Sequence, residues 1–380
     1  MNIIVILSLL IYIIYELFIA LKKRANSRIK VIFYVLFTCL HFGVSFASCY
    51  FLNKNDLTID AVRFHHNALQ SDDWMYLFNL GSDFISFLVY PFVKLNVSFE
   101  VLFFLFATVS FKGFLILFDL LKLDTIKARD SWVLICFLMP SLHYWTGLLG
   151  KEALLMYLMS LLLVKVKQSS FDFYLLVIYG FIFLIRPHLC FVLGLAFLFF
   201  ILIDDEISRI KKLRAFLYSF GSMLVLLPLA LMFFLNVEEF DVKSINDYIN
   251  RFLYYTQTNG QSRIDLIDTN VFERILYLLF MPLPYFYPIK NKFQLAASFE
   301  NVLFLSGFFY LVFYSIKNRI QFYKIKSEVK YALMAGLLMV VLFGSYLYNL
   351  GLGNRMRAVF LPYIFYFFVS TVVFKEDAKV

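Results

Sequence analysis

Long apolar runs alternate with short polar segments along almost the whole chain of 380 residues. Eleven of these runs are near the length that an α-helix needs to cross a bilayer, and a helix satisfies its own backbone polar groups in lipid. The pattern predicts an all-α polytopic integral membrane protein with a single transmembrane domain over residues 1–380. The expected spans are 2–21, 31–52, 97–121, 131–144, 152–164, 171–185, 189–203, 215–236, 297–316, 331–350 and 358–374.

The positions of the basic residues predict the orientation of these helices. Of the 35 Lys and Arg residues, 21 fall in six short segments on one side, which the positive-inside rule makes cytoplasmic. The N-terminus is then outside and the C-terminus inside, and two large external loops are expected at about 53–95 and 237–296. The second loop contains the stretch RILYLLFMPLPYFYP, whose three prolines favour a re-entrant or interfacial element over a spanning helix.

Four of the expected helices are shorter than the apolar core of a bilayer. They form two hairpins whose arms have roughly 13 to 15 residues, at 131–144, 152–164, 171–185 and 189–203. At about 1.5 Å per residue, each arm covers about 20 to 22 Å of a core that is about 30 Å thick. The hairpin turns WTGLLGK and RPH should therefore lie below the outer membrane surface, and a further external turn is expected at GLGNRMR.

The composition excludes a water-soluble globule, because 62% of the residues are hydrophobic and only 16% are charged. The net charge of +9 is explained by the cytoplasmic segments, and no nucleic-acid motif accompanies it, so no nucleic-acid partner is expected. The four cysteines lie in apolar runs without metal-ligand spacing and are expected to pack in the membrane. His41 is expected to make a helix-packing hydrogen bond, and His143, next to Tyr144 and Trp145, to be an interfacial packing residue.

Ionisable residues near the outer ends of the short helices are the candidates for function, because a charge at membrane depth is costly unless it is paired, hydrated or used. Together they predict a cationic external cavity suited to a diphosphate or another anionic lipid head group. The expected substrate-binding residues are Asp60, Arg63, Lys151, Arg186, Arg263, Arg355 and Arg357. The expected catalytic residues are Glu152, His188, His65 and His66.

Several of these candidates also have a purely structural interpretation. Lys151 and Glu152 are neighbours that could neutralise each other, and the Arg186 side chain could extend to lipid head groups. The polar residues of the first loop could simply be solvated. No metal or cofactor is expected, although the pair Asp72-Asp73 in that loop could hold a divalent cation.

Five segments resemble parts of bacterial polysaccharide polymerases. They are IDAVRFHH, PSLHYWTGLLGKEALLMYLMSLLL, IRPHLCFVLGLAF, FENVLFL and NRMRAVFLPYIF. Together with the order of loops and short helices, they make the layout resemble the Wzy-type and EpsG-like families over most of the chain. One departure is that Lys151 stands where EpsG-like chains carry an Arg-containing motif.

This resemblance implies a GT-C-like architecture and a polymerase at the periplasmic face of the bacterial inner membrane. Such an enzyme transfers a glycan from undecaprenyl diphosphate to a lipid-linked repeat unit without a cofactor, and a chain-length regulator can be its protein partner. Negative charge builds on the departing diphosphate, which basic side chains can stabilise, and the acceptor hydroxyl needs a base. On this interpretation Lys151, Arg186, Arg355 and Arg357 bind phosphate, and Glu152 or His188 is the base.

Two other classes of protein stay open. A GT-C glycosyltransferase that uses a polyprenyl-phosphate sugar would favour Asp60 or the pair Asp72-Asp73 as metal or base residues, and its activity should be lost on chelation. A flippase for lipid-linked glycans would need a path across the bilayer. The unusual charges lie near one face of the membrane, which disfavours transport.

Overall fold

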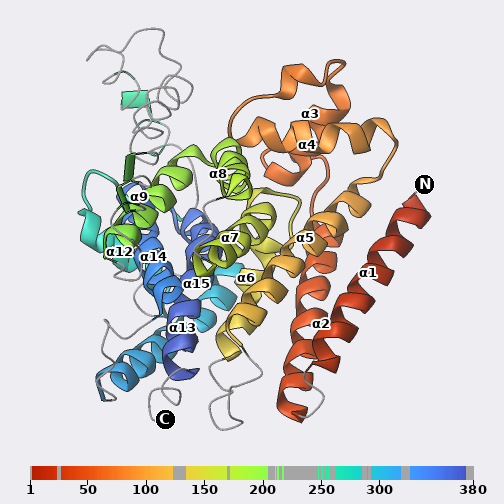
Figure 1. Ribbon diagram of the computed structural model, residues 1–380. Coiled ribbons are helices and arrows are strands. Elements are labelled where there is room, and N and C mark those ends of the chain that lie inside the picture. Colours follow the sequence, from red (N-terminus) through yellow and green to blue (C-terminus); the bar gives the residue numbers. More distant parts are fainter. Residues whose placement is uncertain are drawn as a thin grey trace. The chain divides into compact units, whose positions relative to one another are not determined.

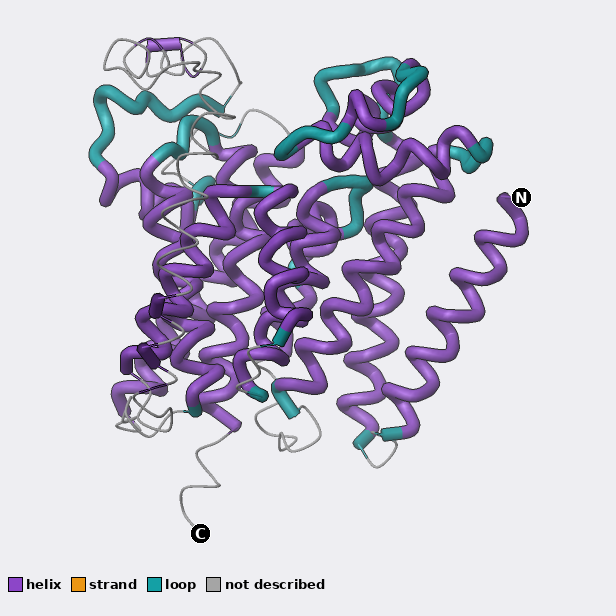
Figure 2. Tube along the Cα trace, turned by 45° about the horizontal axis from the view of Figure 1, so that its top comes forward, coloured by secondary structure: helices purple, strands orange, loops and turns teal. Residues whose placement is uncertain are grey.

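The computed structural model of the chain describes residues 2–23, 27–122, 134–168, 172–203, 262–284, 292–317 and 326–373, with a few single residues between 210 and 289 (Figure 1). The described residues form helices and loops, and no strand occurs among them (Figure 2). The predicted class is confirmed in its coarse form, because long apolar helices make this a helical membrane protein.

Two compact units divide the chain, and each is described by itself. Unit 1 comprises Met1–Arg186 and Phe365–Val380, and unit 2 comprises Pro187–Ile364. The helices of unit 1 are α1 (Asn2–Lys22), α2 (Arg28–Phe51), α3 (Asp60–Gln70), the 3-10 helix η1 (Met75–Leu77), α4 (Ser82–Lys94), α5 (Phe99–Leu120), α6 (Pro140–Thr146), α7 (Lys151–Lys167) and α8 (Phe173–Ile185). Those of unit 2 are α9 (Pro187–Ile203), α12 (Val271–Phe280), α13 (Lys292–Lys317), α14 (Ser327–Ser345) and most of α15 (Leu350–Val373). The single transmembrane domain over residues 1–380 stays a prediction.

Four helices of the described ranges, α1, α2, α5 and α14, are long and apolar enough to cross a membrane. A fifth span results if α6 and α7, which are bent by 99° at their junction, are counted as one broken span. The helices α8 and α9 are apolar but shorter, as the sequence predicts. Eleven spans stay a prediction, since the expected span 215–236 lies almost entirely outside the described residues.

Unit 1 has an aromatic core between α2 and α5. Phe37 of α2 is fully buried, and its ring centroid lies 5.1 Å from that of Phe114 and 4.9 Å from that of Phe118. On another side, α5 packs closely on α7 at Gly113, where an added Cβ would lie 2.8 Å from the Cα of Tyr157. A small residue at this crossing lets two helix backbones approach, as is common in membranes.

Two buried histidines join α2 to α6: His41 makes the expected packing contacts, and His143 is a packing residue that is fully buried. His41 Nδ1 lies 3.1 Å from His143 Nδ1, and His41 Nε2 lies 3.0 Å from the carbonyl oxygen of Ala107. The other ring nitrogen of His143 lies 2.9 Å from the carbonyl oxygen of Phe137. Both imidazoles are therefore packing groups with polar partners, and they connect α2, α5 and α6.

Two expectations from the sequence need correction: the helix arm at 131–144 and the external turn at GLGNRMR. The run 131–144 is not one arm: of its described part, residues 134–138 form a 3-10 turn, and α6 begins only at Pro140. Proline lacks a backbone N–H and favours the first position of a new helix. The string GLGNRMR is not a turn either, because residues 351–357 form the first turns of α15. Asn349 stabilises this start, since its Oδ1 accepts a hydrogen bond from the Leu352 N–H at 2.6 Å.

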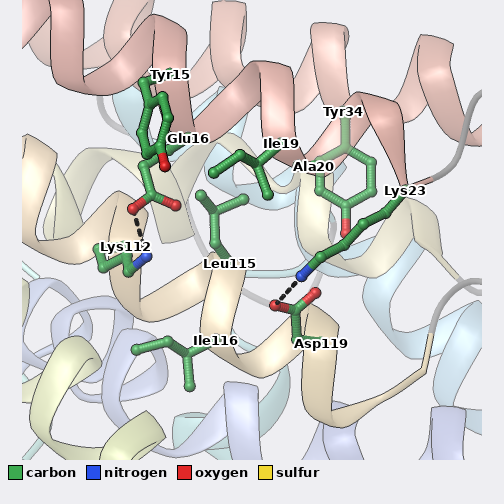
Figure 3. Close-up of a pocket in the computed structure, with 10 residues that line it drawn as sticks. All are labelled: Tyr15, Glu16, Ile19, Ala20, Lys23, Tyr34, Lys112, Leu115, Ile116 and Asp119. Carbon is green, nitrogen blue, oxygen red and sulfur yellow. Dashed lines mark hydrogen bonds and ion pairs between the residues drawn. The ribbon is translucent and has the colours of Figure 1, made fainter.

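Two ion pairs connect α1 with α5 and line a cavity of about 290 Å³ (Figure 3). Lys112 Nζ lies 2.5 Å from Glu16 Oε1, and Lys23 Nζ lies 3.5 Å from Asp119 Oδ2. The partners are seven residues apart on each helix, and the signs of the two pairs are reversed. A slip by one heptad would therefore place like charges opposite each other, so the pairs specify the register of α1 on α5.

We expect a charge swap to test this register. Lys112→Glu should lower the stability of the protein by about 2.5 to 3.5 kcal/mol, because it leaves an unpaired carboxylate at membrane depth. The double change Glu16→Lys with Lys112→Glu should restore most of the loss in thermal unfolding measured in lipid nanodiscs. Lys23→Ala is the control and should change little, since both members of its pair are half exposed. A swap no more stable than Lys112→Glu would contradict the expectation.

In unit 2, α12 packs against α14 and α14 packs against α9. Asn270 begins α12 with a capping box, in which its side chain and that of Glu273 bond each other's backbone N–H groups. The helix has 10 residues, or about 15 Å, and ends before the proline-rich stretch. Such a helix is too short to cross a bilayer. The re-entrant or interfacial placement expected for this stretch stays a prediction, and residues 285–288 lie outside the described residues.

Candidate active site

The candidate site of unit 1 lies where α7 begins and α8 ends. Arg186 Nη2 donates to Glu152 Oε1 in an ion pair whose side chains are only 5% and 3% exposed. Glu152 lies in the first turn of α7, and Arg186 directly follows the last residue of α8. The structure thus brings together two of the predicted site residues, which are 34 residues apart in the chain.

Local sequence explains the position of Arg186. Arg186 precedes Pro187, and a residue before proline is disfavoured in the α conformation, so α8 stops there and α9 begins at the proline. A helix break is present at Arg186, whereas Pro187 and His188, expected in a turn, already belong to α9. The backbone of Arg186 is extended, with φ of −150° and ψ of 86°, and its side chain reaches the start of α7.

The amino end of α7 has the positive end of a helix dipole. Gly150 precedes the helix and provides no side-chain cap for its first backbone N–H groups. Lys151 adds a positive charge beside the Glu152–Arg186 pair. The sum is one net positive charge at a helix start, which is the usual environment for binding phosphate or carboxylate groups.

A third segment, at Gly81, completes this site. Gly81 has φ of 81°, which glycine adopts without strain, and its N–H donates to the carbonyl oxygen of Leu184 at 2.8 Å. An added Cβ at Gly81 would lie 3.9 Å from Lys151 Nζ. Gly81 was not among the predicted site residues. Its one signal in the sequence is the turn-like string NLGSD before an apolar run.

The predicted residues of the first loop lie on α3, which packs on α4. Arg63 Nη2 donates to Asp60 Oδ1 one turn earlier on the helix, and this pair is half-buried. The ring of His65 packs edge-on against Phe99, with 5.4 Å between centroids. His66 is half-buried next to it. Asp60 and Arg63 therefore satisfy each other, and the imidazoles are partly shielded from solvent.

His65 is expected to titrate below the ordinary histidine pKa of about 6.5. Burial lowers the pKa of His65; Glu100 acts in the opposite direction, and His66 and Lys54 lower it further. The unfolded chain binds a proton at this imidazole more readily than the folded chain does. The free energy of unfolding should therefore rise with pH between the lowered pKa and about 6.5. An NMR titration of the imidazole, assigned with His65→Gln, measures this. A midpoint at or above 6.5 would contradict it.

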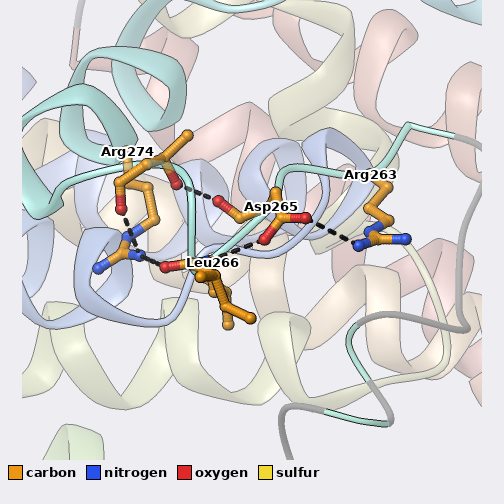
Figure 4. Close-up of polar contacts among 6 residues, drawn as sticks. Arg263, Asp265, Leu266 and Arg274 are labelled. Atoms are coloured by element: carbon orange, nitrogen blue, oxygen red, sulfur yellow. Dashed lines mark hydrogen bonds and ion pairs between the residues drawn. The ribbon is translucent and has the colours of Figure 1, made fainter.

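The remaining predicted residues belong to unit 2. Arg355 is half-buried on α15, and His188 Nε2 lies 3.5 Å from Tyr346 Oη. Arg263 Nη2 donates to Asp265 Oδ2 at 2.9 Å (Figure 4), close to where residues 262–264 pair with residues 348–350 through backbone hydrogen bonds. The common cavity expected from the sequence draws on residues of both units, and it stays a prediction.

Two buried arginines of unit 2 hold the ends of α12 in place. Arg274 Nη1 donates to the carbonyl oxygens of Leu266 at 2.9 Å and Thr269 at 3.0 Å (Figure 4), and its Nε donates to that of Gly344 at 3.2 Å. These contacts bind the start of α12 to the preceding loop and to α14. Arg274 is thus a structural residue of unit 2.

Arg357 binds the other end of α12. Its Nε donates to the carbonyl oxygen of Leu278 at 2.5 Å, and its Nη2 donates to those of Met281 at 2.5 Å and Tyr277 at 3.3 Å. Its Nη1 donates to Asn301 Oδ1. A cation at a helix carboxyl end is favourable, and the guanidinium N–H groups are used within the protein. This geometry does not support the expected role of Arg357 as a phosphate ligand.

Comparisons with protein-family models, with curated proteins and with solved structures found no match for this chain.

Proposed function

We propose that this chain is a membrane polysaccharide polymerase that transfers a glycan from undecaprenyl diphosphate to a lipid-linked repeat unit at the periplasmic face of a bacterial inner membrane. One observation carries the proposal: the buried Arg186–Glu152 pair beside Lys151 at the uncapped start of α7. A helix amino end with two basic side chains is suited to a diphosphate. The buried carboxylate next to it supplies a base.

The proposed reaction breaks the bond between the anomeric carbon of the donor sugar and the diphosphate oxygen. The acceptor hydroxyl forms the new bond to that carbon, its proton passes to a base, and undecaprenyl diphosphate leaves with the bonding electrons. Lys151 and Arg186 stabilise the charge on the leaving group. When the diphosphate binds Arg186, Glu152 loses part of its ion pair and becomes able to take the proton.

Other candidates keep secondary roles in this scheme. His188 is the alternative base, and Arg355 is proposed as a further phosphate ligand. Arg357 is left out of the phosphate set because its donors are already used. The residues of the first loop, between α2 and α5, are proposed to contact the sugars.

The test supplies purified protein in lipid nanodiscs with undecaprenyl-diphosphate-linked repeat units. We expect a ladder of longer glycans that persists in EDTA, because the basic side chains and not a metal are proposed to bind the diphosphate. Addition of a single sugar, with loss of activity in EDTA, would point to the polyprenyl-phosphate glycosyltransferase class. Movement of the lipid across the bilayer without any new product would point to a flippase. Either result would replace the proposed function.

A further inference from the structure

A cavity of about 730 Å³ lies in the first loop of unit 1, between α3, η1 and the start of α4. Its volume is within the range of about 300 to 1,000 Å³ that small-molecule sites occupy. Seven of the nine residues that line it have polar or charged side chains. The side chains that matter here are Asn67, Gln70, Asp72, Tyr76, Asn79 and Asp83. The wall is built from three consecutive elements, so it forms within the loop itself.

Three polar side chains of this wall have no hydrogen-bond partner in the described part of the chain. The side chains of Asn67, Gln70 and Asp72 make no hydrogen bond to any other residue that the structure describes. An amide offers both donors and acceptors, which match the hydroxyl groups of a sugar. Tyr76 is 83% exposed and presents an aromatic ring on which the apolar face of a sugar can stack.

The charge of the wall restricts the kind of sugar. Three carboxylates, Asp72, Asp73 and Asp83, line the cavity, and no Lys, Arg or His does. The described residues contain no group of three His, Cys, Asp or Glu side chains able to hold a metal ion. The wall would therefore repel the carboxylate of a uronic acid and accept neutral or amino sugars.

One short segment of the chain connects the wall of this cavity to the candidate site. Asn79 and Asp83 line the cavity, and Gly81 between them approaches Lys151 and bonds the backbone of Leu184. A lipid-linked glycan has its diphosphate joined directly to its first sugar. With the diphosphate at Lys151 and Arg186, the sugars are near the segment that forms the cavity wall.

We infer that this cavity is the sugar-binding subsite and that it takes neutral or amino sugars rather than uronic acids. The inference rests on the proposed function for the identity of the lipid carrier. The recognition of sugars depends only on the loop.

Saturation-transfer NMR on the full-length protein in lipid nanodiscs tests the inference with three probes: maltotriose, the trimer of glucosamine, and trigalacturonate. We expect transfer to the first two and at least tenfold weaker binding of trigalacturonate. The double change Asn67→Ala with Gln70→Ala should weaken binding at least fivefold. Asn55→Ala, in the same loop but outside the cavity, should leave it unchanged. Asp72→Asn with Asp83→Asn should strengthen binding of trigalacturonate.

Equal binding of trigalacturonate, no transfer to any probe, or no effect of the Asn67 and Gln70 changes would overturn the inference. The polymerisation assay separates this failure from failure of the proposed function. If the wild type makes a ladder and the double variant makes it equally fast, the subsite is wrong and the polymerase stands. If sugars bind as expected but no ladder forms, the subsite stands and the polymerase is wrong.

Discussion

Arg186→Ala is expected to abolish glycan polymerisation and to lower the free energy of unfolding by about 3 to 5 kcal/mol. The loss of stability follows because Glu152, only 3% exposed, would be left without its partner in the ion pair. The loss of product follows from the proposed role of the guanidinium on the diphosphate. Removal of such a donor to developing charge commonly costs 100-fold or more in rate, by the order of magnitude seen at oxyanion sites.

A double variant separates the two effects. Arg186→Ala with Glu152→Gln removes both charges, so most of the lost stability should return. Polymerisation should stay absent, because neither the phosphate ligand nor the base is present. Thermal unfolding in nanodiscs measures the first quantity and the product ladder the second. Recovery of polymerisation in the double variant would show that Arg186 serves only the fold.

The other end of α7 offers a matched control. Lys165 Nζ lies 2.5 Å from Asp172 Oδ2, and Asp172 also caps α8 by accepting from the Leu175 N–H. This pair joins the same two helices as Glu152 and Arg186 but is more exposed, so Lys165→Ala should cost less than about 1 kcal/mol. Its product ladder should match that of the wild type. Loss of product in this control would mean that any weakening of the α7–α8 contact is enough to stop the reaction.

Arg357→Ala should destabilise unit 2 by at least about 3 kcal/mol, since each buried acceptor left without a donor costs about 1 to 3 kcal/mol. The carbonyl oxygens of Leu278 and Met281 and the side chain of Asn301 would lose their bonds. Arg357→Lys should not rescue the protein, because an ammonium group lacks the planar fork that reaches these acceptors together.

Arg355, two residues away in the chain, provides a comparison variant for this prediction. Arg355→Ala should remove the product while lowering the free energy of unfolding by less than Arg357→Ala does, because Arg355 is half-buried and Arg357 is only 3% exposed. Protein yield should fall most in the Arg357 variants. If Arg357→Ala is as stable as the wild type and lacks only activity, its assignment to the fold is wrong.

The lengths of the apolar runs predict the helices, because helix formation in a membrane depends mainly on local sequence. The spans expected at 2–21, 31–52 and 97–121 agree with α1, α2 and α5 to within three residues at each end. The break between α8 and α9 at Arg186 also follows from local chemistry, since the residue before a proline is disfavoured in the helical conformation. Local sequence misled where a polar string was taken as a turn. Residues 351–357 instead form the first turns of α15, and Arg357 hydrogen-bonds the carbonyl oxygen of Leu278.

The candidate site could be predicted only in part. Lys151, Glu152 and Arg186 are recognisable as charges at the ends of short apolar helices. Their pairing is not, because Glu152 and Arg186 meet only after α7 packs on α8. Gly81 has only the turn-like string NLGSD as a signal, and the cavity residues Asn67 and Gln70 have none beyond being polar residues in a loop.

The sequence by itself determined that this is a helical membrane protein and which charged residues deserve attention, because hydrophobicity and the cost of a charge in lipid are properties of single residues and short runs. Only the tertiary structure decided what those charges do. Arg186 and Arg357 are both buried arginines, yet one pairs with a carboxylate beside a helix start and the other caps a helix end 79 residues away. The difference lies in which acceptors the folded chain brings within hydrogen-bond distance of each guanidinium, and these acceptors are distant in sequence.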